Sequence, residues 1–201
     1  MNRLAFFQTD KKIIVGLLCK NQLFWKIENI TSSTQNEKLL HTIQHVIEES
    51  NVKKIDAIIT TKGPGSFTSI RILLSAAMGL SMGYDCPCYL PTVFDLLAYN
   101  RKNPFYITID SKRGTIYTLA VRETLNIENV QELTPETLNI FRNQHDNLDE
   151  LNMDTDNTND EYYIELLKNL CTLSKNPSFV SQDFEPLYVS PLMYKKIHEQ
   201  C

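Results

Sequence analysis

The sequence has no long apolar run and no excess of basic residues. Its apolar runs fall well short of the roughly 20 residues that a membrane-spanning helix needs, and no signal peptide precedes the first of them. Lysine and arginine total 20 against 24 acidic residues, which gives a net charge of −4. Direct binding to duplex nucleic acid usually requires a basic balance. These absences predict a cytoplasmic protein and, if RNA is involved, a partner that supplies most of the phosphate contacts.

Cysteine and histidine are too few and too scattered to predict a redox centre or a metal site. The five cysteines are an odd number, and Cys86 and Cys88 are spaced C-x-C, not C-x-x-C. His41 and His45 share a helix face, as a metal pair can, but no carboxylate has the spacing of a third ligand. We therefore expect a solvated polar face there. With no Ser-His-Asp arrangement and no H-E-x-x-H motif, we predict no catalytic residues and no metal site.

The first hundred residues alternate between short apolar strands and amphipathic helices. Three strands joined by tight turns come first, and βα units follow. Thr34 and Glu37 have the spacing of a capping box before the first helix. This order predicts an α/β fold with a mixed five-stranded sheet covered by helices. The expected strands are 4–7, 12–19, 22–27, 55–60 and 88–90, and the expected helices are 34–50, 67–82 and 93–99.

A second, smaller unit is expected in the remaining half of the chain. Residues 143–161 are rich in Asn and Asp, which predicts a mobile loop. We divide the chain into an N-terminal subdomain, 1–101, and a C-terminal subdomain, 102–201. The elements expected in the second are strands 105–110, 115–121 and 131–133, a hairpin turn at 111–114, a helix starting at Pro135 and a helix over 162–173.

The stretch KGPGSFTSIR connects an expected strand to the helix over 67–82. Gly63 and Gly65 let the backbone approach a ligand closely, and a helix N-terminus favours an anion. Ser66 or Thr68 can cap the helix. The Lys-Ser/Thr end of a Walker loop is missing, which excludes a P-loop NTPase. A loop that binds phosphate or a partner and a plain structural turn both stay open.

The helix expected over 67–82 carries only one charged residue, Arg71, and is apolar almost all round. Such a helix is buried on more than one side. Ser75, Gly79 and Gly83 lie four residues apart and form a ridge with almost no side chain. Another helix can approach closely along such a ridge. The burial is either inside this chain or against a helix of a partner subunit.

Several short motifs resemble those of the TsaB (YeaZ) family. Residues 63–73 are similar to its signature G-P-G-S-F-T-G-x-R-I-G, with Ser69 and Leu73 in place of the last two glycines. The resemblance is close over residues 34–121 and weaker at both ends. The further matching segments are 36–40 to the helix start S-E-x-L-L, 83–87 to G-L-x-x-P, 110–117 to D-A-R-R-x-E-V-Y, and 186–189 to the terminal P-x-Y-L.

The resemblance implies two actin-like ATPase (RNase H-like) subdomains, the first complete and the second reduced. It also implies a role, because TsaB-type proteins pair with a paralogous subunit, TsaD. They support transfer of a threonylcarbamoyl group to the adenosine beside the anticodon of tRNAs that read ANN codons. A TsaE-type ATPase joins the same assembly. The complex as a whole would then contact the tRNA. The resemblance implies no cofactor bound by this chain alone, and it allows a nucleotide to bind at the interface with the partner subunit.

Two departures from family patterns concern the chemistry. The catalytic metal site belongs to TsaD, whose H-x-x-x-H motif matches residues 92–96, and this chain has no histidine there. Family members usually have D-T-S in the first hairpin, whereas this chain has Gln8, Thr9 and Asp10. The resemblance therefore implies a subunit without catalytic residues of its own.

Our hypothesis is a scaffold subunit that binds TsaD through the helices expected at 34–50 and 67–82. Two alternatives stay open, a stand-alone ATP-dependent enzyme of the same fold and a homodimeric regulatory protein. The enzyme would need a carboxylate at the phosphates, and the homodimer would use the same apolar surface. The candidates for the partner interface are Glu37, Leu40, Ile70, Arg71, Leu74, Ala77, Met78 and Gly79, and the phosphate-loop-like residues are Gly63, Gly65, Ser66 and Thr68.

Overall fold

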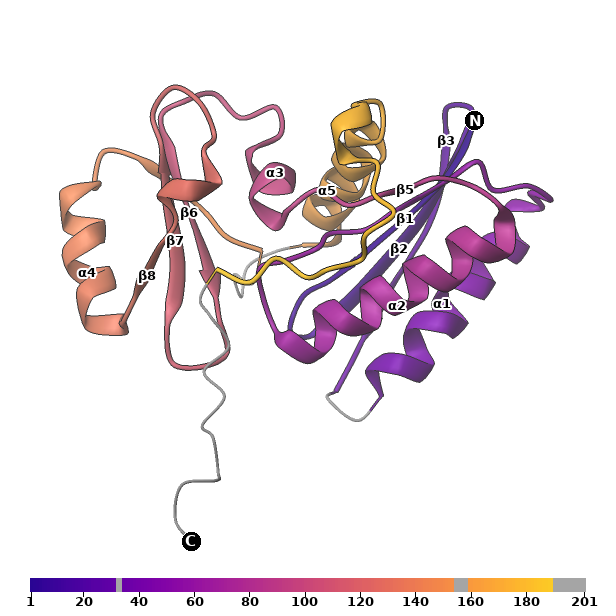
Figure 1. The fold of residues 1–201 in the computed structure, drawn as a ribbon, viewed down its shortest axis with the longest axis horizontal. Helices are drawn as coiled ribbons and strands as arrows, with labels where there is room; N and C mark the ends of the chain where they lie inside the picture. The colour runs from indigo at the N-terminus through magenta and orange to yellow at the C-terminus, as the bar shows by residue number, and fades with distance from the viewer. Residues whose placement is uncertain (32–33, 154–158, 190–201) are drawn as a thin grey trace, which may run out of the picture.

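The first three strands form an antiparallel meander within the larger of two sheets (Figure 1). The computed structural model describes residues 1–31, 34–153 and 159–189. The strands pair in the order β3-β2-β1-β4-β5, with β4 parallel to both β1 and β5. This is the mixed five-stranded sheet that the sequence predicted. Its strands are β1 (Asn2–Gln8), β2 (Lys12–Cys19), β3 (Gln22–Asn29), β4 (Ala57–Ile59) and β5 (Cys88–Tyr89).

Helices cover both faces of this sheet. Successive residues of a strand point to opposite faces, so Leu4 and Phe6 join one core cluster and Ala5 and Phe7 join the other. Figure 1 shows the two longest helices side by side on one face. That face holds α1 (Gln35–Ser50) and α2 (Phe67–Tyr84), and the other holds α3 (Val93–Ala98) and α5 (Asp160–Leu173). Within the described ranges, no helix combines the length and the apolar character needed to cross a membrane.

The second sheet has four strands in the order β8-β7-β6-β9. Its antiparallel part is the hairpin and short third strand that the sequence predicted, and β9 adds a parallel edge. The elements of this unit are β6 (Phe105–Asp110), β7 (Ile116–Val121), β8 (Gln131–Leu133), α4 (Pro135–Gln144) and β9 (Asp149–Leu151), with a short 3-10 helix at Ile127–Asn129. A second short 3-10 helix, Pro177–Phe179, follows α5 and lies beside β5 of the first sheet.

Strand β9 lies inside the segment predicted to be a mobile loop, so that prediction is wrong there. Glu150 fixes the strand, because it accepts a hydrogen bond from Thr108 Oγ1 at 2.7 Å and forms an ion pair with Arg142 at 2.8 Å. Burial raises the pKa of Glu150, but the hydrogen bonds from Arg142 and Thr108 outweigh burial and hold it below its ordinary value. Residues 154–158 of the segment lie outside the described residues.

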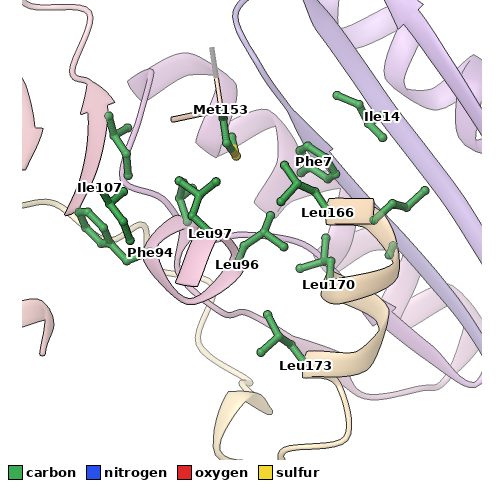
Figure 2. Close-up of a cluster of buried hydrophobic side chains, with 14 of the residues drawn as sticks. Phe7, Ile14, Phe94, Leu96, Leu97, Ile107, Met153, Leu166, Leu170 and Leu173 are labelled. Carbon is green, nitrogen blue, oxygen red and sulfur yellow. The ribbon is translucent and has the colours of Figure 1, made fainter. Parts of the chain in front are cut away.

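Helix α5 follows the second sheet in sequence but packs on the first. Leu166 and Leu167 are almost completely buried and share a core cluster with Phe7 and Ile14 of β1 and β2 (Figure 2). The same cluster continues to Ile107 of β6, so one core joins the two units. A division of the chain at residue 101 therefore leaves α5 on the wrong side of the boundary.

The capping box predicted at the start of α1 does not form. Thr34 is the N-cap residue, but it makes no side-chain cap hydrogen bond. Its hydroxyl lies 3.1 Å from the Thr31 hydroxyl and donates to the Thr31 carbonyl at 3.3 Å, and these contacts compete with capping. A capping box forms instead at α3, where Thr92 Oγ1 accepts from the Asp95 amide and Asp95 Oδ2 accepts from the Thr92 amide.

Candidate functional site

The glycine-rich loop between β4 and α2 is held in place by its own chain. The Gly63 carbonyl accepts from the Val93 amide at 2.8 Å, and the Lys62 carbonyl accepts from the Leu187 amide at 2.7 Å. Gly63 has a φ of +105°, and a Cβ at this position would lie 2.9 Å from Ile70 Cδ1. The positive φ therefore favours glycine here, whether or not a ligand binds.

Neither hydroxyl expected to cap α2 does so. Ser66 is the N-cap residue and makes no side-chain cap hydrogen bond, although its carbonyl accepts from the Ile70 amide at 3.0 Å. Ser66 lines a small cleft together with Gly65, and Thr68 is exposed on the first turn of the helix. The capping prediction is therefore wrong, because the two side chains face the cleft and the surface.

The small cleft lies between the two units, near the ends of β1 and β6. Its volume is about 40 Å³. A space of this size holds only a few water molecules and is far too small for a nucleoside phosphate. Residues from both units line it, among them Gln8, Asp10, Ser66, Ser69 and Asp110.

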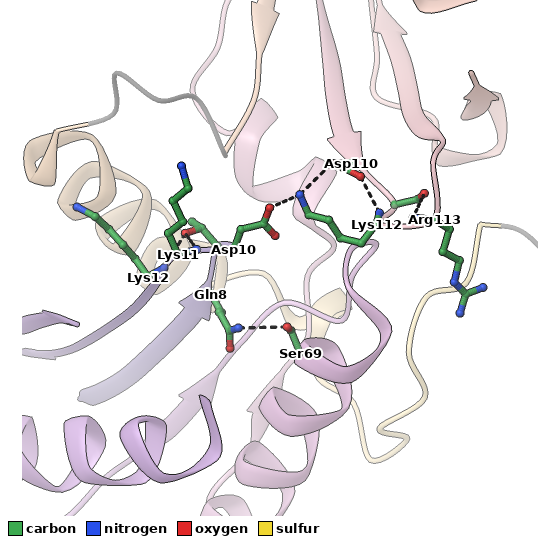
Figure 3. A network of polar contacts seen from close by, with 10 residues as sticks. Gln8, Asp10, Lys11, Lys12, Ser69, Asp110, Lys112 and Arg113 are labelled. Carbon is green, nitrogen blue, oxygen red and sulfur yellow. Dashed lines mark hydrogen bonds and ion pairs between the residues drawn. The ribbon is translucent and has the colours of Figure 1, made fainter. Parts of the chain in front are cut away.

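Lys112 joins the two units at this cleft (Figure 3). Its ammonium group forms ion pairs with Asp10 of the first unit and with Asp110 of its own hairpin, the latter at 2.8 Å. Burial lowers the pKa of Lys112, but the hydrogen bonds to Asp10 and Asp110 outweigh burial and raise it above its ordinary value. Burial raises the pKa of Asp110, and the hydrogen bonds from Lys112 outweigh it and lower that pKa. The ammonium group of Lys112 thus lies between the carboxylates of Asp10 and Asp110 and neutralises part of their charge.

Gln8 and Ser69, which both depart from the resembled family's pattern, contact each other. Gln8 Nε2 donates to Ser69 Oγ at 3.1 Å (Figure 3). The family pattern has aspartate at the first position and glycine at the second. The buried Gln8 Oε1 accepts no hydrogen bond from a described residue. The cleft therefore presents a neutral amide where the pattern has an acid.

Replacing Lys112 with methionine is expected to lower the free energy of unfolding by about 1 kcal/mol at neutral pH, because it leaves two carboxylates without their cation. The lowered pKa of Asp110 adds stability that is present above its unfolded-state value and is lost as the pH falls through its folded-state value. The raised pKa of Lys112 adds stability that is present up to about pH 10. The difference between variant and wild type should therefore shrink below about pH 4.

Urea denaturation of both proteins at about pH 3 and about pH 7 measures this difference. Lys54→Met is the matched control, because the Lys54 side chain is 79% exposed and lies 3.8 Å from Asp56. We expect it to change stability by less than about 0.5 kcal/mol. A Lys112→Met effect of equal size at both pH values would show that the ion pairs do not stabilise the closed cleft.

The histidine pair is solvated, and Cys88 is one of two buried free cysteines in the described part of the chain. His41 and His45 are exposed and lie 3.9 Å from Glu37 and Glu49, respectively. Among the described residues, no group of three His, Cys, Asp or Glu side chains is placed to hold a metal ion. Burial raises the pKa of Cys88 to about 12, so its thiol stays protonated.

A second concave surface, the α1–α2 groove, is open and mostly apolar. It has a volume of about 710 Å³ and runs between the two helices. A Cβ built at Gly79 or Gly83 would meet no atom within 4 Å. The ridge predicted from the glycine spacing therefore faces outward and is not used for packing within the chain. The groove is lined by residues that include Leu40, Phe67, Ile72, Ser75, Gly79 and Leu80.

The structure separates the predicted interface candidates into two groups. Three of them are only 6%, 3% and 0% exposed, because this side of α2 packs against the first sheet. These three residues, Ile70, Leu74 and Ala77, belong to the core of the chain, so the prediction that they contact a partner is corrected. The exposed group consists of Glu37, Leu40, Arg71, Met78 and Gly79.

The sequence analysis missed the role of Lys112 and Asp110. Residues 111–114 were predicted as a hairpin turn inside the motif-like stretch 110–117, and no ion pair was predicted there. A signal was present, because Asp10 and Lys112 carry opposite charges and each stands in a hairpin turn of one unit. The contact between them depends on how the two units meet, which spacing along the chain does not reveal.

The two sheets, with helices on both faces of the first and a small cleft between the units, form an actin-like ATPase-type α/β fold. YeaZ from Pseudomonas aeruginosa matches with a TM-score of 0.66 at 16% identity, covering 94% of this chain and 99% of that chain. A protein with similarity to peptidase YeaZ from the same organism matches with a TM-score of 0.57 at 22% identity, over 67% of each chain. These similarities establish the fold.

The family described as "TsaD: tRNA N6-adenosine threonylcarbamoyltransferase" matches residues 29–184, so the chain belongs to this family. Curated relatives confirm the TsaB/YeaZ resemblance within it. The "tRNA threonylcarbamoyladenosine biosynthesis protein TsaB" of Buchnera aphidicola subsp. Baizongia pistaciae is 35% identical over 89 residues, which is 42% of this chain and 38% of that protein. Its counterpart from subsp. Schizaphis graminum is 24% identical over 105 residues, 49% and 50% of the two chains. The chain thus spans about half the length of these relatives or less.

Proposed function

We propose that this chain is a non-catalytic subunit that binds a TsaD-type paralogue. In this role it supports formation of N6-threonylcarbamoyladenosine next to the anticodon of tRNAs that read ANN codons. The observation that carries the proposal is the open α1–α2 groove with Gly79 exposed in it. The family description and the relatives' names supply the reaction. A TsaE-type ATPase and tRNA would join through the complex.

The α1–α2 groove has the size and character of a helix-docking surface. Helix α2 has 18 residues, which corresponds to a length of about 27 Å, and α1 has 16. A standard interface buries roughly 800 Å² on each partner, which two such helices side by side can present. Because Gly79 and Ser75 have little or no side chain, the backbone of a partner helix can come close to α2. A helix pair of a paralogous subunit fits this surface.

The closed cleft supports the non-catalytic part of the proposal. An ATP-dependent enzyme of this fold would place the phosphates near Asp10, where the ammonium group of Lys112 now stands. Nucleotide binding would have to break the ion pairs of Lys112 and widen the cleft. A nucleotide at the interface with the partner subunit would avoid this cost.

The proposal is tested by mixing the full chain with the TsaD paralogue of the same organism. We expect co-elution in gel filtration, a calorimetric dissociation constant in the micromolar range or tighter, and threonylcarbamoyl transfer to tRNA only when both proteins are present. The chain alone should show neither transfer nor ATP turnover.

Two other outcomes would favour the alternatives. Tight binding of ATP and Mg²⁺ with turnover by the isolated chain would identify a stand-alone enzyme. Self-association in sedimentation experiments, without affinity for TsaD, would identify a homodimeric protein that uses the α1–α2 groove for its own second copy.

A further inference from the structure

Four side chains from three distant segments meet where α2 begins. The Arg71 guanidinium lies over the Phe67 ring, with its Cζ 3.8 Å from the ring centroid, and the Cζ of Arg113 lies 5.6 Å from the same centroid. Tyr188 stacks on Phe67 at 5.7 Å between centroids, and its hydroxyl accepts from Arg71 Nε at 3.4 Å. We call these four residues the arginine–aromatic cluster. It brings two positive charges to one place on an acidic protein.

The two arginines of the arginine–aromatic cluster have no acidic partner within the described part of the chain. The arginines that do form ion pairs there are elsewhere, Arg101 with Glu165 and Arg142 with Glu150. Arg71 and Arg113 are both exposed. Stacking on an aromatic ring holds a guanidinium in position. Arg71 donates from Nε to Tyr188, which leaves its terminal N–H groups to bind a ligand. The cluster is therefore a prepared binding position for an oxyanion.

The position of the cluster favours a protein carboxylate as that oxyanion. Phe67 and Arg71 also line the α1–α2 groove, so the cluster forms a charged rim beside an apolar centre. Protein interfaces have this arrangement, with arginine enriched among the residues that contribute most to binding. We infer that Arg71 and Arg113 bind an acidic side chain of the partner subunit whose helices occupy the α1–α2 groove. This inference rests on the proposed function.

RNA is the less suitable ligand for this cluster. The Phe67 ring is already covered by Arg71 and Tyr188, so a base has no free face of it on which to stack. Binding of a polyanion relies on many phosphate contacts, whereas the chain has a net charge of −4. Two guanidinium groups match one carboxylate, which accepts hydrogen bonds in a bidentate manner.

The test compares Arg71→Gln, Arg113→Gln and the double variant with wild type in calorimetric titrations with the TsaD paralogue. We expect the double variant to bind roughly 10- to 100-fold more weakly at low salt, because hydrogen bonds to a charged group are lost. The loss should become smaller at high salt, where the charge attraction is screened. Arg71→Lys should restore only part of the affinity, because lysine lacks the planar fork. Arg101→Gln is the matched control and should bind like wild type.

The outcomes separate the two proposals. If wild type does not bind TsaD, the proposed function is wrong. If wild type binds and the double variant binds with the same affinity and the same salt dependence, the inference about the carboxylate is wrong and the proposed function stands. If the double variant keeps its affinity for TsaD but loses affinity for tRNA in fluorescence anisotropy with the chain alone, the cluster binds RNA and the inference is overturned. Equal melting temperatures of all variants exclude misfolding as the cause.

Discussion

Replacing Leu167 with alanine should lower the free energy of unfolding by about 3–5 kcal/mol. Leu167 of α5 is fully buried where this helix packs on the first sheet. It packs directly over Gly16 of β2, where a Cβ would lie 3.0 Å from Leu167 Cγ. Truncation therefore loses buried surface and leaves a cavity that a sheet cannot easily close. Since domains are stable by only about 5–15 kcal/mol, a fall in melting temperature of roughly 10 °C is expected, which calorimetry would measure.

Leu40→Ala makes the same chemical change on an exposed helix and serves as the control. Leu40 is 57% exposed on α1, so its truncation should change stability by less than about 0.5 kcal/mol. The two variants together test the assignment of α5 to the first sheet. If the free energy of unfolding of Leu167→Ala lies within about 1 kcal/mol of the wild-type value, α5 does not complete that core.

The sequence predicted most helices and strands because their signals are local. The strands of both hairpins and the helices α1, α2 and α5 follow from alternation, helical spacing and turn residues. The packing partner of α5 was not predictable in this way. Its apolar stripe shows that one face is buried. The same spacing of apolar residues would occur whether the helix packed on the first sheet or on the second.

Side-chain contacts between distant residues explain the other differences. The segment around β9 has the composition of a loop, yet Glu150 is held by Thr108 and Arg142. Sequence spacing could not separate core from surface residues among the interface candidates on α2, because Leu74 and Met78 are both apolar. Only the position of the sheet shows that Leu74 is in the core and Met78 is on the surface. The ion pair of Lys112 was not predicted either, because its partner Asp10 lies about a hundred residues away in the sequence.

Replacing Gly79 with leucine should weaken binding to the TsaD paralogue by on the order of 100-fold, or roughly 2.8 kcal/mol, without destabilising the chain. The space above Gly79 is empty, since a Cβ there meets no atom within 4 Å. Leucine therefore fits the isolated chain, and it is also a better helix former than glycine, by somewhat less than about 1 kcal/mol. A partner helix that approaches α2 along the ridge would collide with the new side chain. Calorimetric titration and thermal melting measure the two effects separately.

Asn139→Leu is the matched control, because it adds the same side chain to an exposed position of α4 in the other unit. It should leave the affinity for TsaD unchanged, whereas Gly79→Ala should give a loss smaller than that of Gly79→Leu. This order follows if the size of the side chain at position 79 limits the approach of the partner. If Gly79→Leu melts at or above the wild-type temperature and still binds TsaD with wild-type affinity, the partner does not use the α1–α2 groove, and the scaffold proposal would need another surface.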